Sequence, residues 1–363
     1  MRAVHLTARG FRNLADLDLE LPPGGAVFLG PNAHGKTSLL ECLYYPVLFR
    51  SFRAATDSEV TRWDGPGFRL TLEANVTGAS RTFSAEFDRA ARQKRVQVDG
   101  APVPRITDAV GEWLAVAFLP TDLSLVQGAA VERRRYLDRV LSLADARYLR
   151  ALIRFRATLA QRNAALRSGN DAVARAFDPQ LREPGAYVVQ RRHQWVREMA
   201  EEFAAECAAL GEESRITIRY RGNPALAEEA EWDAALQAAA AQEITRGMSL
   251  VGPQRDDLML ECDGRSLRDF GSTGQHRTAA IALKLCELAT LRAARRVEPV
   301  LLLDDVFSEL DRERQQHLAA RLGAPAVQQV CVTTPRRDEL PPDLELEVFE
   351  VTLGRVRPAG VPA

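Results

Sequence analysis

The sequence predicts an α/β protein in which a mixed β-sheet stands beside an antiparallel β meander and is interrupted by an inserted, mostly helical lobe. Three observations support this fold class. An apolar run at 26–29 leads through a glycine-rich loop into a helical pattern, which is the strand–loop–helix order of a phosphate-binding unit. A second apolar run at 300–303 ends in two carboxylates. Between the runs, the spacing of apolar residues changes from alternation to recurrence every three or four positions.

The glycine-rich loop at residues 30–37 reads GPNAHGKT, which has the form GxxxxGKT. Gly30 and Gly35 permit torsions and close approaches that a Cβ would block, so that backbone amides can point at a phosphate. Lys36 supplies a cation for the outer phosphates, and the hydroxyl of Thr37 can ligate Mg²⁺. The sequence therefore predicts a nucleoside triphosphate site whose contacts in this segment are Gly30, Pro31, Asn32, Ala33, His34, Gly35, Lys36, Thr37 and Ser38.

Two carboxylates, Asp304 and Asp305, follow the apolar run at 300–303. Ligands of parallel α/β sheets bind beyond the carboxyl ends of the strands, so we expect both acids near the nucleotide. Asp304 suits the metal, together with Thr37, and Asp305 suits polarisation of the attacking water. The predicted catalytic residues of this segment and the loop are thus Lys36 and Asp305. The alternative is that the pair caps the next helix.

Strands and helices are predicted in separate parts of the chain. Apolar residues alternate with polar ones at 68–74 and 83–87, which predicts an antiparallel meander. Helical spacing covers 131–167 and 186–210, and we expect the prolines and glycine at 178–185 to separate these two stretches.

A length of 363 residues suits about two domains. We expect a discontinuous head made of residues 1–120 and 246–363 and an inserted lobe at 121–245. The insert is too short for a long coiled-coil arm, because an α-helix rises by only about 1.5 Å per residue.

Composition limits the partners and the compartment. The formal net charge of −1 gives no general attraction for a polyanion, so that a nucleic-acid site would have to be a local patch. Five scattered cysteines without a CxxC pair indicate a reducing compartment, with no disulfide framework or zinc site. No apolar run approaches 18 residues and no signal peptide is recognisable, so we expect a cytoplasmic protein without a membrane partner.

Further motifs carry a family resemblance. The segment Ser272-Thr273-Gly274-Gln275 resembles the SGGQ signature of ABC-type ATPases, and SELD at 308–311 resembles the loop after their second acid. FRNL at 11–14, ERRRYLD at 132–138 and LVGPQRDDL at 250–258 narrow the likeness. Together these strings are similar to the RecF family of bacterial recombination mediators. Gln254 departs from the family's usual His, and Thr273 and His276 vary its Gln-Gly-Gln-Gln.

The resemblance implies an ABC-type P-loop ATPase head that uses ATP and Mg²⁺. It implies a homodimer in which Ser272, Gly274 and Gln275 of one subunit contact the ATP of the other, Ser272 being counted among the catalytic residues. It also extends the nucleotide site to Arg12 and Asn13. The implied function is an ATP-dependent clamp of recombinational DNA repair and replication. This clamp would dimerise on double-stranded DNA near single-strand gaps, help to load recombinase onto single-stranded DNA, act with mediators such as RecR, and be reset by slow hydrolysis.

Three groups of basic residues are candidates for contact with DNA phosphates, although a charge run is more often a solvated face. They are Arg89, Arg92, Lys94 and Arg95; Arg133, Arg134 and Arg135; and Arg191 and Arg192. Two alternative functions remain open at this point. An ATPase subunit of an ABC transporter should lack the large insert, and a P-loop small-molecule kinase would have no use for the STGQ segment.

Overall fold

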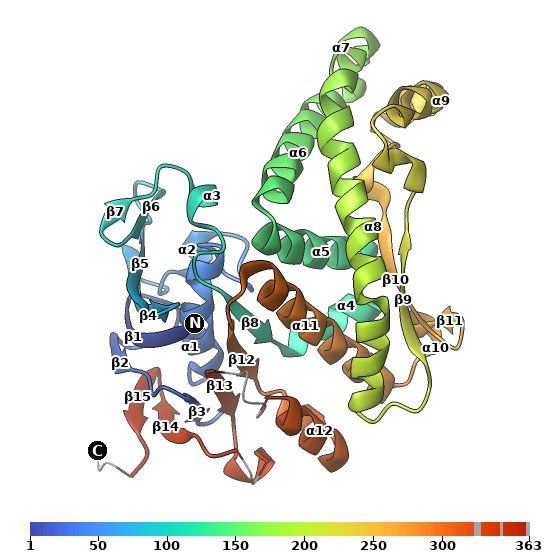
Figure 1. Ribbon diagram of the computed structural model, residues 1–363. Helices are drawn as coiled ribbons and strands as arrows, with labels where there is room; N and C mark the ends of the chain where they lie inside the picture. Colours follow the sequence, from blue (N-terminus) through green and yellow to red (C-terminus); the bar gives the residue numbers. More distant parts are fainter. Residues whose placement is uncertain (323–327, 342–343, 361–363) are drawn as a thin grey trace. The chain divides into compact units, whose positions relative to one another are not determined.

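The computed structural model describes residues 1–322, 328–341 and 344–360, and the chain forms two compact units (Figure 1). The first unit consists of Met1–Asp122 and Glu287–Ala363, and the second of Leu123–Cys286. The sequence places the return to the head near residue 246, whereas in the structure it follows Cys286. The reason is strand pairing: β10 (Asp257–Cys262) pairs along its whole length with β9 (Ile216–Arg221), so this segment completes the second unit.

One sheet of the first unit is antiparallel and contains the predicted meander. In spatial order its strands are β2 (Leu17–Glu20), β1 (Arg2–Arg9), β4 (Gly67–Val76), β5 (Ala79–Asp88), β6 (Gln93–Val98) and β7 (Ala101–Pro102). Phe68, Leu70 and Leu72 are buried on one face of β4, as their alternation predicts. Asp99 and Gly100 both have positive φ, 52° and 77°, which matches the twist of the two-residue turn from β6 to β7.

The other sheet of this unit is mixed and carries the phosphate-binding loop. In spatial order its strands are β15 (Arg355–Pro358), β14 (Glu347–Thr352), β3 (Gly25–Leu29), β13 (Val330–Thr334), β12 (Val300–Asp304) and β8 (Ala115–Phe118). All neighbours pair in parallel except β15, which is antiparallel to β14. Every residue of β12 and β13 is buried, which is why these strands read as continuous apolar runs. The predicted mixed sheet beside an antiparallel meander is confirmed.

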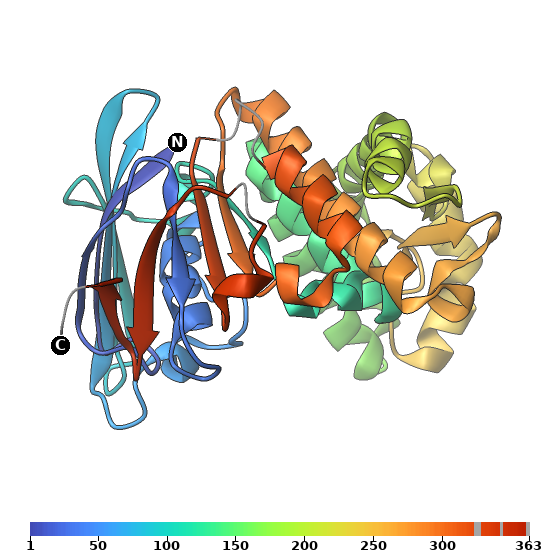
Figure 2. The ribbon, with the colours of Figure 1, turned by 90° about the horizontal axis from the view of Figure 1, so that it is seen from below.

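Helix α1 (Lys36–Tyr44) begins at the phosphate-binding loop and packs against both sheets, touching β8, β12 and β13 on one side and β1 on the other (Figures 1 and 2). Eight of its nine residues are buried, so its sequence has no polar face. Pro46 lies in the 3₁₀ turn Tyr45–Val47 that directly follows α1. The remaining α-helices described in this unit are α2 (Asp57–Val60), α3 (Ile106–Ala109) and α12 (Arg312–Leu322).

The second unit packs helices against the small sheet β11 (Arg265–Ser266), β10 and β9. The 32-residue helix α8 (Asp178–Ala209) packs against β9 and α6, and an edge-to-face contact between Tyr136 and Trp195 lies in its core. The other helices are α4 (Ser124–Gln127), α5 (Ala130–Ala144), α6 (Ala146–Arg167), α7 (Asp171–Ala176), α9 (Glu231–Arg246), α10 (Leu267–Phe270) and α11 (Thr273–Arg295), which continues into the first unit.

Two helix boundaries differ from the sequence prediction. The stretch 131–167 is two helices, because Asp145 ends α5 and its side chain then accepts a hydrogen bond from the amide of Arg147 to cap α6. The stretch at 178–185 does not separate helices but forms the start of α8, with Pro184 inside the helix. A Cβ on Gly185 would lie 2.2 Å from Trp232, so only glycine fits at this position without displacement of the indole. None of the helices in the described ranges combines the length and the apolar character that a membrane span requires.

Candidate nucleotide-binding site

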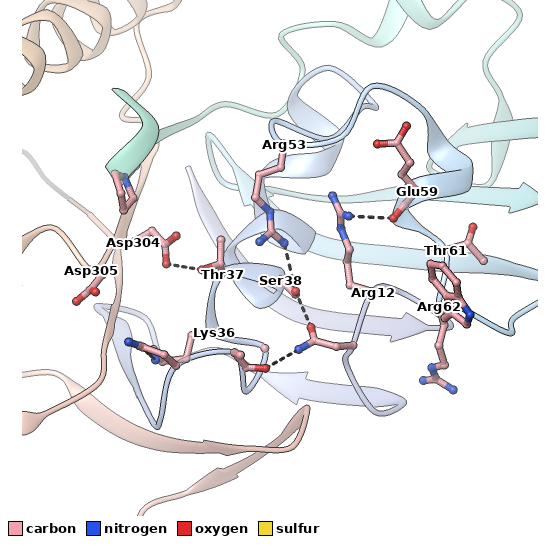
Figure 3. Close-up of a pocket in the computed structure, with 16 residues that line it drawn as sticks. Arg12, Lys36, Thr37, Ser38, Arg53, Glu59, Thr61, Arg62, Asp304 and Asp305 are labelled. Carbon is pink, nitrogen blue, oxygen red and sulfur yellow. Dashed lines mark hydrogen bonds between the residues drawn. The ribbon is translucent and has the colours of Figure 1, made fainter. Parts of the chain in front are cut away.

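A cavity of about 690 Å³ in the first unit brings the predicted nucleotide residues together (Figure 3). Its wall includes Arg12 and Asn13 after β1, the loop residues Asn32 and Ala33, and residues 35–38 at the start of α1. Asp304 and Asp305 complete it from the end of β12. Chain segments nearly 300 residues apart thus form one pocket, as the rule for strand ends predicts.

The loop conformation depends on its glycines. Gly35 has φ 107°, in the left-handed region, and is followed directly by α1. A Cβ on Gly30 would lie 2.1 Å from the carbonyl oxygen of Val351 on β14. The side-chain amide of Asn13 donates to the carbonyl of Ala33 at 2.9 Å and its oxygen accepts from Ser38 at 2.8 Å. Asn13 therefore fastens the loop to the segment after β1.

Lys36 is held by the loop itself. Its ammonium group donates to the carbonyls of Gly30 at 2.6 Å and Pro31 at 3.0 Å and to Asn32 Oδ1 at 3.3 Å. Burial lowers the pKa of Lys36, although the charges of Asp305 and Asp304 oppose that shift. Phosphate oxygens are stronger acceptors for a cation than these carbonyls, so an entering triphosphate can draw the ammonium group away from them.

The first carboxylate of the pair joins the loop to the sheet. The Thr37 hydroxyl donates to Asp304 Oδ1 at 2.9 Å, and Thr333 from β13 donates to the same oxygen at 2.7 Å. In the described part of the chain, no cluster of three or more His, Cys, Asp or Glu side chains could hold a metal alone. A hydroxyl and one carboxylate instead fit the partial ligand set that Mg²⁺ takes beside substrate phosphates, where its charge neutralises the triphosphate.

The second carboxylate, Asp305, lies in a different environment. Its φ of 55° is unusual for a residue other than glycine, and its Oδ1 is buried without a hydrogen-bond partner in the described ranges. Partial burial raises the pKa of Asp305; a hydrogen bond from Ser308 opposes the shift and the charge of Glu339 adds to it. A half-buried carboxylate with an unsatisfied oxygen is suited to accept a proton from water.

The carboxylate that orients Arg12 was not predicted from the sequence. Glu41 on α1 is fully buried and accepts five hydrogen bonds, from Arg12, Arg53 and Ser51. Burial alone would raise the pKa of Glu41, but the bond from Arg12 and the other donors outweigh it and lower that pKa. Arg12 and Arg53 are thereby fixed in the pocket wall. Arg53 ends the segment RSFR at 50–53, but only the fold reveals its partner, Glu41.

Three of the loop residues predicted to contact the nucleotide do not line this cavity. Gly30 and Pro31 line a separate cavity of about 420 Å³, together with residues 335–337. The backbone of His34 accepts a hydrogen bond from the Gly354 amide at 2.9 Å. These three residues therefore shape the loop from behind, and any role in nucleotide contact stays a prediction.

The STGQ segment lies in the second unit and caps α11. Ser272 and Gln275 exchange hydrogen bonds, because each side chain accepts from the amide of the other at 3.2 and 3.0 Å. Gln275 also donates to Glu212 at 3.1 Å. His276 is buried, with one ring nitrogen on the carbonyl of Leu267 and the other on Gln127. The structure brings Ser272, Gly274 and Gln275 together at one helix end, and none of these three residues lines the cavity described above.

Most of the candidate DNA-contacting residues have structural partners. Arg133 is buried in a two-bond ion pair with Asp257, and Arg192 is buried against Asp138. Lys94 forms an ion pair with Asp57 at 2.8 Å, while Arg89 donates to three backbone carbonyls at 58–63. These four are committed to the fold and are not free to bind phosphates. The clustering of basic residues in sequence gave no sign of this.

The fold and the pocket define the class of protein: the first unit is an ABC-type P-loop ATPase head. A family model described as an AAA domain matches residues 5–112. The chain is 38% identical to the DNA replication and repair protein RecF of Chloroflexus aurantiacus, covering 92% of this chain and 93% of that protein. It is 33% identical to RecF of Herpetosiphon aurantiacus, covering 99% and 100%. The chain belongs to the RecF family of DNA replication and repair proteins.

Solved structures agree with this assignment. A recombination mediator protein RecF–ATP of the RecFOR pathway superposes with a TM-score of 0.90 at 26% identity, covering 99% of this chain and 98% of that one. An Smc head domain from Pyrococcus furiosus shares the fold alone, with a TM-score of 0.56 at 12% identity. The ABC-transporter alternative finds no support in these similarities.

Proposed function

We propose that the chain is an ATP-dependent DNA-binding clamp of recombinational repair and replication. ATP would close two copies into a homodimer on double-stranded DNA near single-strand gaps, where the dimer helps to load recombinase onto single-stranded DNA. The observation that carries this proposal is the hydrogen bond from Thr37 to Asp304, which holds the loop and the strand end together where a triphosphate and Mg²⁺ would bind. The similarity to a RecF–ATP structure over 99% of the chain supports ATP as the nucleotide.

Dimerisation is proposed because two half-sites lie on separate units. Lys36 and Thr37 belong to the first unit and Ser272 to the second. Ser272 stands at the N-terminus of a helix of 23 residues, where a hydroxyl and backbone amides favour a phosphate. In a two-fold dimer, Ser272, Gly274 and Gln275 of each subunit would contact the ATP of the other. Since ATP would then bind the dimer best, it would stabilise the dimer by mass action.

Hydrolysis would open the clamp. Asp305 would accept the proton of the attacking water, while Lys36 holds the phosphates. Asp is one methylene shorter than the Glu of transporter ATPases, so we expect slow turnover that DNA stimulates. The slow rate of hydrolysis would then set how long the dimer stays closed.

The remaining partners are proposed from the family. DNA would be bound through its phosphates with little sequence preference, and mediators such as RecR would act with the clamp. All five cysteines are free, and four of them are buried, which supports a reducing, cytoplasmic location.

Sedimentation velocity with ATP, with ADP and without nucleotide tests the clamp, each with and without gapped duplex. We expect a dimer with ATP, most of all on DNA, and a monomer in the other states. A protein that stays monomeric in ATP at every concentration would refute the proposal. DNA affinity should also fall steeply as salt rises, because each phosphate contact releases counterions.

Mixing two inactive variants tests whether the site is shared between subunits. Lys36→Ala removes the loop cation and Ser272→Arg blocks the other half-site. A mixed dimer contains one intact pair, the loop of one variant facing Ser272 of the other, so ATPase activity should return on mixing. Without recovery, Ser272 does not act across the interface. Ser168→Ala, which alters a serine that donates to the Ala165 carbonyl and does not line the nucleotide cavity, serves as a serine control.

A further inference from the structure

One aromatic side chain in the pocket wall is almost entirely exposed to solvent. The Trp63 side chain is 89% exposed, whereas Trp113, Trp195 and Trp232 are at most 1% exposed. Trp63 lines the cavity that also contains Lys36 and Thr37. An exposed indole does not contribute the stabilising free energy of about 2 kcal/mol or more that its burial would give. An exposed side chain of this kind therefore usually marks a binding surface.

The backbone that carries Trp63 is firmly held. The segment before it runs alongside the residues that follow β1: the Arg12 amide donates to Val60 and the Arg62 amide donates to Gly10, both at 2.7 Å. Arg89 donates to the carbonyl of Trp63 at 2.7 Å. The indole is therefore displayed from a fixed backbone and not from a loose loop.

The residues predicted to hold the triphosphate lie at one end of the cavity, here called the phosphate end, and other lining residues form the opposite end. Figure 3 shows Asp304, Asp305 and Lys36 on one side, and Thr61 and Arg62 on the other, with Ser38 and Arg12 between them. Trp63 follows Arg62 directly in the chain. The Arg62 guanidinium is bonded to the Leu14 carbonyl at 2.7 Å and to Asp16 at 3.0 Å, so it is not available to cover the indole.

We propose that Trp63 is the base-binding residue of this site and that its indole stacks on the adenine of ATP. The lining is otherwise mainly polar, and Trp63 is its one aromatic side chain among the described residues. The flat face of a purine can stack on the flat face of an indole. With the triphosphate bound near Lys36, the base would lie toward the opposite end of the cavity, where Trp63 is. This inference rests on the proposed function, because it assumes that the pocket binds ATP.

Intrinsic fluorescence provides a direct test. Because the other three tryptophans are buried, iodide quenches mainly Trp63 in the intact protein. Saturating ATP with Mg²⁺ should shield Trp63 from iodide and change its emission. Tripolyphosphate with Mg²⁺, which fills the phosphate end alone, should leave both properties unchanged. Equal iodide quenching with and without bound ATP would overturn the inference.

Calorimetric titration of variants gives the second measurement. Trp63→Ala should weaken ATP binding about tenfold or more, the value of one base–aromatic stack, and leave tripolyphosphate binding unchanged. Trp63→Phe should recover most of the ATP affinity while losing the fluorescence change. An equal loss for both ligands would assign Trp63 a structural role, and no loss would assign it none in binding.

The controls separate this inference from the proposed function. If wild type and Lys36→Ala both fail to bind ATP, the nucleotide site itself is wrong. If ATP binding depends on Lys36 but not on Trp63, only the base-stacking role fails.

Discussion

Replacement of Glu41 by Gln should loosen helix α1 and the phosphate-binding loop that precedes it. Glu41 is fully buried and accepts five hydrogen bonds from three side chains. Glu41→Gln keeps the shape but leaves Arg12 and Arg53 without a counter-charge. Loss of one partner from a buried ion pair costs about 3–5 kcal/mol. We expect about 3 kcal/mol, the low end, since the Arg12 and Arg53 side chains are 21% and 36% exposed and water can solvate them in part.

Hydrogen exchange measured by mass spectrometry resolves this effect locally. Amides of α1 should exchange about 100-fold faster in Glu41→Gln, because about 1.4 kcal/mol corresponds to a factor of ten. Peptides from α8, in the second unit, provide an internal control. Glu59→Gln is the matched variant: the exposed Glu59 carboxylate accepts a local hydrogen bond from Thr56, and the Glu59 carbonyl, which accepts from Arg12, is unchanged by the substitution. Exchange should therefore stay near the wild-type rate.

The contribution of Glu41 to stability should depend on pH in a direction that follows from its pKa. The pKa of Glu41 is lowered in the folded protein, so its contribution is present above the ordinary value of 4.5 and is lost as the pH falls through the folded value. The difference in exchange between wild type and Glu41→Gln should therefore narrow below pH 4.5. Wild-type exchange in α1 of Glu41→Gln at neutral pH would refute the reasoning, because the buried ion pair would then contribute nothing.

Three further outcomes are expected. Asp305→Asn should retain ATP but hydrolyse it far more slowly, so light scattering should find a lasting dimer in ATP; a monomer there would contradict the role of Asp305. Gly185→Ala should lower stability by about 1–3 kcal/mol through overpacking, because its Cβ would lie 2.2 Å from Trp232; an unchanged melting temperature would mean that the helix and indole adjust freely. Arg192→Met should cost about 3–5 kcal/mol by leaving the buried Asp138 with a weaker set of partners, and urea unfolding followed by circular dichroism would detect it.

Some of the fold could be predicted because the signal is local. The meander follows from alternation within β4 and β5, and the loop conformation follows from Gly35, whose φ of 107° other residues avoid. The prediction failed where a tertiary contact outweighs a local preference. Pro184 and Gly185 read as a break between helices, yet α8 runs through them because Gly185 packs against Trp232.

The roles of charged residues were the least predictable. Arg133 and Arg192 look like surface cations in sequence, but each has a buried carboxylate partner, the second of them 54 positions away along the chain. Charge alone cannot reveal burial, since a buried ion pair and a solvated pair have the same residue types. The domain boundary moved from residue 246 to Cys286 for a similar reason: the pairing of β9 with β10 is a long-range contact.

The phosphate-binding loop, the paired carboxylates and the resemblance to RecF all follow from the sequence, because each consists of contiguous residues whose chemistry has one main use. Which side chains share the pocket depends on the tertiary structure. Thr37 donates a hydrogen bond to Asp304, 267 positions away in the chain, and Arg12 donates to Glu41, 29 positions away. Trp63 lines the same cavity although its segment carries no motif. These contacts depend on the packing of α1 between two sheets, which no local pattern encodes.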